Sequence, residues 1–450
     1  MRFYTKGEVM NYLEIILITY CALLFLALIC YIPKFKCWVF GFKKTEKLTN
    51  EKKSKIALLI PAKNESECIS PLFDSINNQT YNKSLFDVFI IVDNEQDETI
   101  NIAKNKLHNA SIVVEKNQKC KADALDTAIK YIYESSLNIY DAYIVVDADN
   151  ILTDNFVEEM NNALVTKADV IIGKKLIKNW ESTNKKHRTL FTNLSALTYT
   201  GLDTMGNKYK TTKGCALALC GQGMLLSKKF VDRYKGFPFK TLCEDVEVGV
   251  HAMLNDDKQF YYEHALIYSE EPVTHKEYNK RRYRWLKGYF DNNKKYRKAL
   301  LKKTFGQGKI VKENLHFLYD LTPVYFMIGT TAVALVTYLV NSIVLAIMKS
   351  SLLKESLLLT LLMFVIIYGM IALFNFVTVI EDKDTNKMSL SEKLKVVFLG
   401  PLITFEYVII FFKTIRSDFK VNWEHVERIN LDEKNWNDWI NGWNGNYRRF

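Results

Sequence analysis

Short apolar runs that end in polar residues recur through the first part of the chain. Apolar residues at three- and four-residue spacing, the period of a helix, lie between these runs. The apolar runs cover residues 55–61, 87–92, 111–114, 143–146 and 170–173. A repeated order of strand, helix and strand is typical of a parallel sheet with helices on both faces, so the pattern predicts an α/β domain.

Polar side chains gather just past the ends of these runs. They are Asn64, Glu65, Asp93, Asn94, Asp97, Asp147 and Asp149. In open parallel sheets, ligands bind at the carboxyl ends of the strands, where the crossover order switches. We therefore expect a binding site at this edge of the sheet.

The run at 143–146 ends in two carboxylates one residue apart, Asp147 and Asp149. Side chains alternate between faces only while the chain is extended, so a turn at the strand end lets both carboxylates converge. Hard oxygen ligands of this kind suit Mg²⁺ or Mn²⁺, which also takes oxygens from a substrate diphosphate. The alternative is a solvated turn, since Asp and Asn are common turn formers.

Three later motifs each have a structural and a chemical interpretation. Gly221-Gln222-Gly223 is either a tight turn or a close approach of backbone to ligand. The adjacent acids at 244–245 start an apolar helix, either as charge that favours its N-terminus or as a general base. The arginines and tryptophan of segment 281–285 form either a basic patch near a membrane or a diphosphate clamp with a stacking platform.

Missing sequence motifs argue against several classes of protein. No Gly-x-Gly-x-x-Gly follows the first run and no Walker lysine motif is present, which argues against a dinucleotide dehydrogenase and a P-loop enzyme. The eight cysteines form no Cys-x-x-Cys pair and have no histidines at zinc spacing. We expect free thiols in a reducing compartment.

Positive charge lies beside long apolar runs. The formal net charge is +11, and lysines follow the apolar run at residues 15–32, which is close to the ~20 residues that a spanning helix needs. A cleaved signal peptide is the alternative, but no small-x-small cleavage site follows. Basic residues favour the cytoplasmic side of a membrane, and we prefer this explanation of the charge to nucleic-acid binding. The domain after the first helix is therefore expected in the cytoplasm.

Three more apolar runs follow, at residues 321–348, 357–380 and 394–415. The first two are long enough to span a bilayer. Three spans would place the C-terminus outside, whereas the basic tail favours the inside. A re-entrant or interfacial third run, which contains Pro401 and Glu406, would resolve this conflict. The tryptophans of the tail fit an interfacial belt, a helix stripe or a sugar-stacking surface.

The predicted organisation has six segments. They are a transmembrane helix at 1–33, a basic linker at 34–54, a catalytic domain at 55–290, a basic interfacial segment at 291–320, membrane helices at 321–415, and a tryptophan-rich basic tail at 416–450.

The order of motifs resembles the membrane-bound family 2 glycosyltransferases, which include bacterial cellulose, hyaluronan, chitin-oligomer and poly-N-acetylglucosamine synthases. The resemblance covers about residues 55–290. Its motifs are Ile60-Pro61-Ala62-Lys63-Asn64-Glu65, Val92-Asp93-Asn94, Lys121-Ala122-Asp123-Ala124-Leu125, Asp147-Ala148-Asp149, Gly221-Gln222-Gly223, Glu244-Asp245 and Arg281-x-x-Arg284-Trp285.

The resemblance implies a GT-A-type fold, with a parallel-sheet catalytic domain and α-helical transmembrane segments, and a role for each matching position. The residues implied to bind the donor are Pro61, Asn64, Glu65, Asp93, Lys121 and Asp147. Asp149 is the implied metal ligand, and Asp245 is the implied catalytic base. The residues implied to bind the diphosphate and the acceptor are Gly221, Gly223, Glu244, Arg281, Arg284 and Trp285. The implied cofactor is Mg²⁺ or Mn²⁺.

Three positions depart from the family pattern. Cys120 stands where glycine is usual, Cys243 where threonine is usual, and Arg281 where processive synthases usually have glutamine. The last departure weakens the case for a long-chain polymerase.

The expected function is inverting hexosyl transfer from a nucleotide-sugar, a UDP-sugar by resemblance, to a growing cell-surface polysaccharide. The enzyme is expected in the cell membrane as a multi-pass protein, with export of the product through its helices and polysaccharide-export subunits as candidate partners. A non-processive transferase acting on a lipid acceptor is one alternative. A non-catalytic membrane partner of another synthase is the second, although the intact acids at 147, 149 and 245 argue against it.

Overall fold

The structure is a computed structural model. It describes residues 45–415 except 117, 136–138, 183, 307–309, 322, 348 and 350–352, together with isolated positions before residue 45. Apart from those positions, the predicted N-terminal helix at 1–33 lies outside the described residues, as does the predicted tail at 416–450. The described residues fall into two compact units, one within Gly41–Phe317 and one within Leu318–Lys420. The finer domain limits expected from the sequence stay predictions.

An eight-stranded sheet forms the centre of the first unit, in the order β3-β2-β1-β4-β7-β6-β8-β5. Its strands are β1 (Ile56–Pro61), β2 (Phe86–Val92), β3 (Ala110–Val114), β4 (Ala142–Val145), β5 (Ile151–Leu152), β6 (Val170–Ile177), β7 (Met224–Ser227) and β8 (Gln259–Ser269). The first four strands in sheet order pair in parallel, as the sequence predicts. The sheet as a whole is mixed, because β7 runs antiparallel to both β4 and β6.

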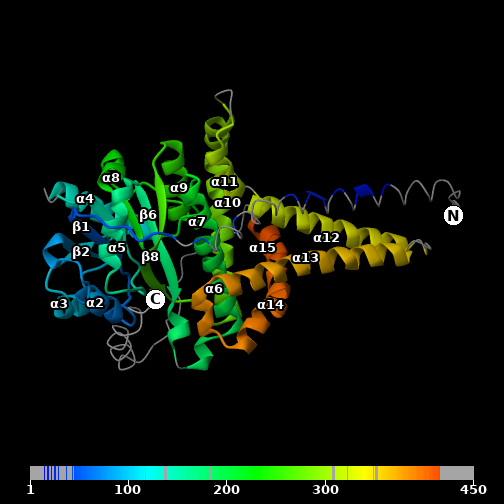
Figure 1. Ribbon diagram of the computed structural model, residues 1–450, viewed down its shortest axis with the longest axis horizontal. Helices are drawn as coiled ribbons and strands as arrows, with labels where there is room; N and C mark the ends of the chain where they lie inside the picture. Colours follow the sequence, from blue (N-terminus) through cyan, green and yellow to red (C-terminus); the bar gives the residue numbers. More distant parts are fainter. Residues whose placement is uncertain are drawn as a thin grey trace. The chain divides into compact units, whose positions relative to one another are not determined.

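Helices cover both faces of this sheet (Figure 1). The α-helices of the first unit are α2 (Ser70–Asn77), α3 (Thr99–Lys106), α4 (Lys121–Glu134), α5 (Phe156–Ala163), α6 (Leu190–Thr200), α7 (Lys208–Thr212), α8 (Lys228–Tyr234), α9 (Glu244–Leu254) and α10 (His275–Phe305). Buried residues of α2, α3 and α5 pack on one face, and those of α4, α8 and α9 on the other. The predicted α/β architecture is therefore confirmed.

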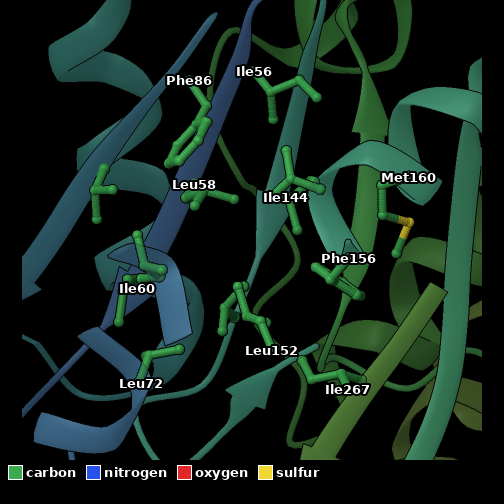
Figure 2. Packing of buried hydrophobic residues seen from close by; sticks show 14 of the residues in the cluster. Ile56, Leu58, Ile60, Leu72, Phe86, Ile144, Leu152, Phe156, Met160 and Ile267 are labelled. Atoms are coloured by element: carbon green, nitrogen blue, oxygen red, sulfur yellow. The ribbon is translucent and has the colours of Figure 1, made fainter. Parts of the chain in front are cut away.

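Alternation along the strands divides the core into two layers. Ile56, Leu58 and Ile60 of β1 face the first layer together with Leu72 of α2. Figure 2 shows these side chains packed around β1 and β4. Ala57 and Leu59, the intervening residues, face the second layer. Since successive side chains of a strand point to opposite faces, a strand buried on both faces must be apolar at every position, as the sequence of β1 is.

The second unit is helical. Its elements are α12 (Pro323–Ile347), α13 (Leu353–Glu381), α14 (Leu390–Thr404) and α15 (Glu406–Ile415), and α11 (Lys312–Leu321) joins the two units in sequence. By length and composition, Leu353–Glu381 and Leu390–Ile415 could each cross a membrane. Polar side chains join the helices within this apolar unit: Asn375 Nδ2 donates to the carbonyl of Val396 at 3.1 Å. Whether 390–415 spans or re-enters stays a prediction.

Candidate active site

The turn after β4 carries the paired acids. The N–H of Asn150 donates to the carbonyl of Asp147 at 3.0 Å, and the side-chain Oδ1 of Asn150 accepts from the N–H of Asp147 at 3.0 Å. Asp149 is 5% exposed, and its Oδ1 accepts from Asn150 Nδ2 at 3.3 Å. The sequence DADN is thus a tight turn, and the turn also holds a buried carboxylate at the end of a central strand.

Lys121 links this turn to two later motifs. It is the first residue of α4, whose start is fixed by a capping box between Cys120 and Asp123. Its Nζ forms an ion pair with Asp147 Oδ1, donates to the carbonyl of Gly221 at 2.9 Å and lies 3.7 Å from Glu244 Oε1. Burial disfavours the ammonium, but the nearby carboxylates outweigh it and raise the pKa of Lys121.

The bend at 221–223 holds the second acid of α9. The N–H of Gly221 donates to Asp245 Oδ2 at 2.8 Å. Gly223 has a φ of 63°, which favours glycine, and the chain then enters β7. Burial raises the pKa of Glu244 to about 7, Lys121 opposes this rise, and Asp245 adds to it. The two adjacent acids are therefore in different environments, and Asp245 is the one that accepts from the bend at 221–223.

Other predicted donor residues lie at the ends of β1 and β2, which are neighbours in the sheet. Lys63 Nζ forms an ion pair with Asp93 Oδ2 at 3.0 Å. Asn64 is exposed with a φ of 53°, and its N–H donates to Asp97 Oδ2 at 2.9 Å. Because β1, β2 and β4 are parallel, these groups occupy the same edge of the sheet as Asp147.

The remaining two residues predicted to bind the donor are Pro61 and Glu65. Pro61 ends β1 and is half-buried. Glu65 is buried, and its Oε2 accepts from the thiol of Cys68 at 3.0 Å. The part of Pro61 and Glu65 in donor binding stays a prediction.

The arginine and tryptophan motif lies on α10, which packs against the start of α9. A Cβ placed on Gly288 would lie 2.3 Å from Cys243 Sγ, so glycine is needed for this close approach. Cys243 Sγ also contacts the carbonyl of Arg284 at 3.9 Å. The residue before the two acids therefore sets the distance between α9 and α10.

Sequence reasoning missed the partners of this motif, Glu271 and Tyr199. Arg281 Nη1 lies 2.6 Å from Glu271 Oε2, and the ring centroids of Trp285 and Tyr199 are 5.6 Å apart. The available signal was the pair of acids at 270–271, which directly follow β8 and are both buried. Tyr199 had no such signal, since it lies in an apolar helix.

The residues at the DADN turn fit a hard divalent cation in part. Among the described residues, no group of three or more His, Cys, Asp or Glu side chains forms a metal cluster. The turn supplies carboxylate oxygens of the right chemical type, but Asp147 is already paired with Lys121. The protein therefore offers Asp149 as the main ligand, and a bound diphosphate and water would have to supply most of the others.

Comparison with known sequences agrees with the motif order. The sequence profile described as "Glycosyltransferase like family 2" matches residues 54–288, just over half of the chain. The "Probable glycosyltransferase YdaM" of Bacillus subtilis (strain 168) is 25% identical over 242 residues. That match covers 52% of this chain and 55% of YdaM, so the chain spans about half the length of this relative.

Comparison with solved structures gives the fold. Mannosyltransferase PcManGT from Pyrobaculum calidifontis, in complex with GDP-Man and Mn²⁺, aligns with a TM-score of 0.52 at 14% identity, over 76% of this chain and 98% of that chain. S. aureus TarS 1-349 in complex with UDP-GlcNAc aligns with a TM-score of 0.39 at 12% identity, over 77% and 91% of the two chains. The likeness to PcManGT shows a GT-A-like mixed-sheet domain.

Proposed function

The chain belongs to the Glycosyltransferase like family 2 and is a glycosyltransferase, and we propose that it transfers a sugar from a UDP-sugar to an acceptor hydroxyl with inversion at the anomeric carbon. One observation carries this proposal. Lys121 contacts both Asp147 and the bend that holds Asp245, so residues 100 positions apart converge on one point. This convergence supports an active site in which a base candidate lies beside the strand ends where a donor would bind.

In this proposal Asp245 is the general base. It accepts the proton of the acceptor hydroxyl as that oxygen bonds to the anomeric carbon, and the bond from that carbon to the diphosphate breaks. The N–H of Gly221 fixes the carboxylate at 2.8 Å and so limits its rotation before the proton transfer. UDP leaves with the bonding electrons on its terminal phosphate oxygen.

Arg284 would receive the charge that develops on the departing diphosphate, and Lys121, which is paired with Asp147, would lie near the nucleotide. Lys121 has a raised pKa and stays charged at neutral pH. Arg284 is half-buried on α10, and within the described part of the chain its guanidinium has no carboxylate partner. Preorganised charges of this kind stabilise a transition state because they need no rearrangement as the reaction proceeds.

Asp149 would hold Mg²⁺ or Mn²⁺ in this site, while Asp147 would contact the donor. When bound, such an ion supplies counter-charge to the diphosphate. PcManGT was solved with GDP-Man and Mn²⁺, which supports this assignment by analogy of fold. Asp93, at the end of β2, would contact the uracil or ribose, and Trp285 would stack on the acceptor.

The proposed product is a cell-surface polysaccharide, made at the cytoplasmic face of the membrane and moved outward. Two apolar helices within the described residues are long enough to cross a bilayer, and they support a membrane location together with the basic segments. A single transfer to a lipid acceptor is the second candidate. It is favoured by Arg281, which stands where processive synthases usually have glutamine and is paired with Glu271.

Labelled nucleotide-sugars test this proposal. Full-length protein in membrane vesicles is incubated with Mn²⁺ and a panel of labelled UDP-sugars, with GDP-mannose as the comparison suggested by PcManGT. We expect incorporation from a UDP-sugar into a product that gel filtration resolves as long chains. A lipid-sized product would support the second candidate, and incorporation from GDP-mannose alone would overturn the choice of UDP.

A further inference from the structure

The guanidinium of Arg281 binds two groups within the protein. Its Nη1 lies 2.6 Å from Glu271 Oε2, and its Nη2 donates to the carbonyl of Glu270 at 3.2 Å. Two different nitrogens of the guanidinium thus bind the segment that follows β8. Glu271 is buried with a side chain only 1% exposed, so the positive charge of Arg281 is offset at close range.

Glu271 is itself held firmly. Its carboxylate accepts from the hydroxyls of Ser195 and Ser269. Its N–H donates to Asn179 Oδ1 at 2.8 Å, and its carbonyl accepts from Asn179 Nδ2 at 2.9 Å. Because these hydrogen bonds fix the Glu271 carboxylate, they also fix the guanidinium of Arg281 that is paired with it. Moving the guanidinium would leave a buried charge without its partner.

That position lies over the ring of Trp285. The guanidinium carbon of Arg281 is 5.8 Å from the centroid of the Trp285 ring, and the two residues are one helical turn apart on α10. Tyr199 meets the same indole at a centroid distance of 5.6 Å and an interplanar angle of 82°. Lys175 in turn lies 4.3 Å from the centroid of the Tyr199 ring.

The two arginines of the motif therefore differ. Arg281 has its charge offset by Glu271, whereas no described residue pairs with the guanidinium of Arg284. A diphosphate clamp needs an arginine whose donors are available to phosphate oxygens. Arg284 meets this requirement and Arg281 does not.

We propose that Arg281 is a positioning residue that covers one face of Trp285 and leaves the other face to stack on the acceptor sugar. This inference rests on the proposed function of the site. A sugar ring presents an apolar C–H face to an indole, so the orientation of Trp285 sets the plane of the acceptor ring. With Arg281 over one face of the indole, a single pyranose ring would stack on the other face. Arg281 then acts on the acceptor and not on the diphosphate of the donor.

The test separates these two substrates. Full-length protein in vesicles receives the labelled UDP-sugar that the wild type uses best, with Mn²⁺ and the endogenous acceptor. Free labelled sugar measures hydrolysis of the donor, which needs no acceptor, and incorporated label measures transfer. The variants are Arg281→Gln, Arg281→Lys, and Glu271→Gln combined with Arg281→Gln, which removes both charges and leaves no buried carboxylate unpaired. Lys276→Gln, exposed on the same helix, is the control for loss of one positive charge.

We expect Arg281→Gln to lower transfer about tenfold, the size of a partly desolvated cation–π contact, while hydrolysis and the donor KM stay unchanged. Arg281→Lys should recover part of the transfer, because it keeps the cation over the ring, and the double variant should resemble Arg281→Gln. Unchanged transfer in Arg281→Gln would overturn the inference. A parallel fall of hydrolysis and transfer would do so too, since it would place Arg281 on the diphosphate. A wild type that neither hydrolyses nor transfers any donor would contradict the proposed function itself, and this inference with it.

Discussion

The backbone N–H of Gly221 donates a hydrogen bond of 2.8 Å to the carboxylate of Asp245. The carbonyl of the same glycine accepts from Lys121 Nζ at 2.9 Å. The N–H of Gly221 therefore binds the base candidate Asp245, and its carbonyl binds Lys121, which also contacts Asp147. The bend before β7 thus couples the orientation of Asp245 to the ion pair of Lys121 with Asp147.

Replacing Gly221 with alanine should lower kcat without unfolding the protein. The new Cβ would lie 3.0 Å from Glu244 Oε1 and 3.1 Å from Lys121 Nζ, both ends of flexible side chains that can move aside. Their movement disturbs the catalytic geometry, where a shift of ~1 Å can cost about 10²-fold in rate. We expect a loss of at least about tenfold in kcat, measured by sugar transfer. Gly369→Ala, at a position where the Cβ meets nothing within 4 Å, is the control and should keep wild-type activity.

Replacing Gly288 with alanine should instead destabilise the first unit. The added Cβ would lie 2.3 Å from Cys243 Sγ and 2.8 Å from its Cβ, so α10 must move away from α9. Overpacking of this kind typically costs ~1–3 kcal/mol. Thermal unfolding of the purified protein measures the loss. Combining the change with Cys243→Ala should restore part of it, and strictly additive effects of the two changes would contradict the contact.

Glu244 should make stability depend on pH. Burial raises its pKa in the folded state to about 7, from 4.5. The folded state therefore binds more protons than the unfolded state in this window, so the contribution of Glu244 to the free energy of unfolding falls as the pH rises from about 4.5 to about 7. Glu244→Gln should remove this decline, as measured by denaturation at several pH values.

Glu247, on the same helix, provides the matched comparison. Burial raises its pKa, but hydrogen bonds from Lys295 and Tyr296 outweigh burial and lower it overall. Stability from Glu247 should therefore be present above its ordinary pKa and be lost as the pH falls, the opposite slope. Equal slopes for Glu244→Gln and Glu247→Gln would contradict both assignments.

Asp149 should be needed for transfer but not for folding. Asp149→Ala removes the carboxylate that would hold the divalent ion, so we expect transfer to be lost while the unfolding temperature stays near that of the wild type. Titration with Mn²⁺ monitored by calorimetry, in the presence of UDP, should show weaker binding for the variant. Full transfer in excess EDTA would rule out the metal.

The strand pattern made half of the sheet predictable. β1 and β4 are continuous apolar runs, and β2 is apolar except for the half-buried Asp87, because strands buried on both faces carry few polar residues. The direction of β7 was not predictable, since antiparallel pairing with β4 and β6 depends on residues far away in the sequence. The short β5 has only two residues, too few to show a period.

The candidate site was predictable as a set of positions but not as a network. Polar residues at strand ends pointed to Asp147, and the structure brings it to Lys121 as the parallel order requires. The pairing of Glu271 was not predictable, because it depends on Arg281, ten residues later, and on a helix that begins at His275. Contacts of this kind depend on how α10 packs, which no local pattern specifies.

Asp245→Asn is the most direct test of the catalytic assignment. The amide keeps the shape of the carboxylate and an oxygen that can accept from Gly221, but it cannot take up the acceptor proton. Calorimetry with UDP and Mn²⁺ measures binding on the donor side, and incorporation of labelled sugar measures transfer. We predict near-normal UDP affinity and a loss of transfer of at least about 10²-fold, the lower end of the range for a general base. Transfer by Asp245→Asn at the wild-type rate would contradict the assignment and place the base elsewhere.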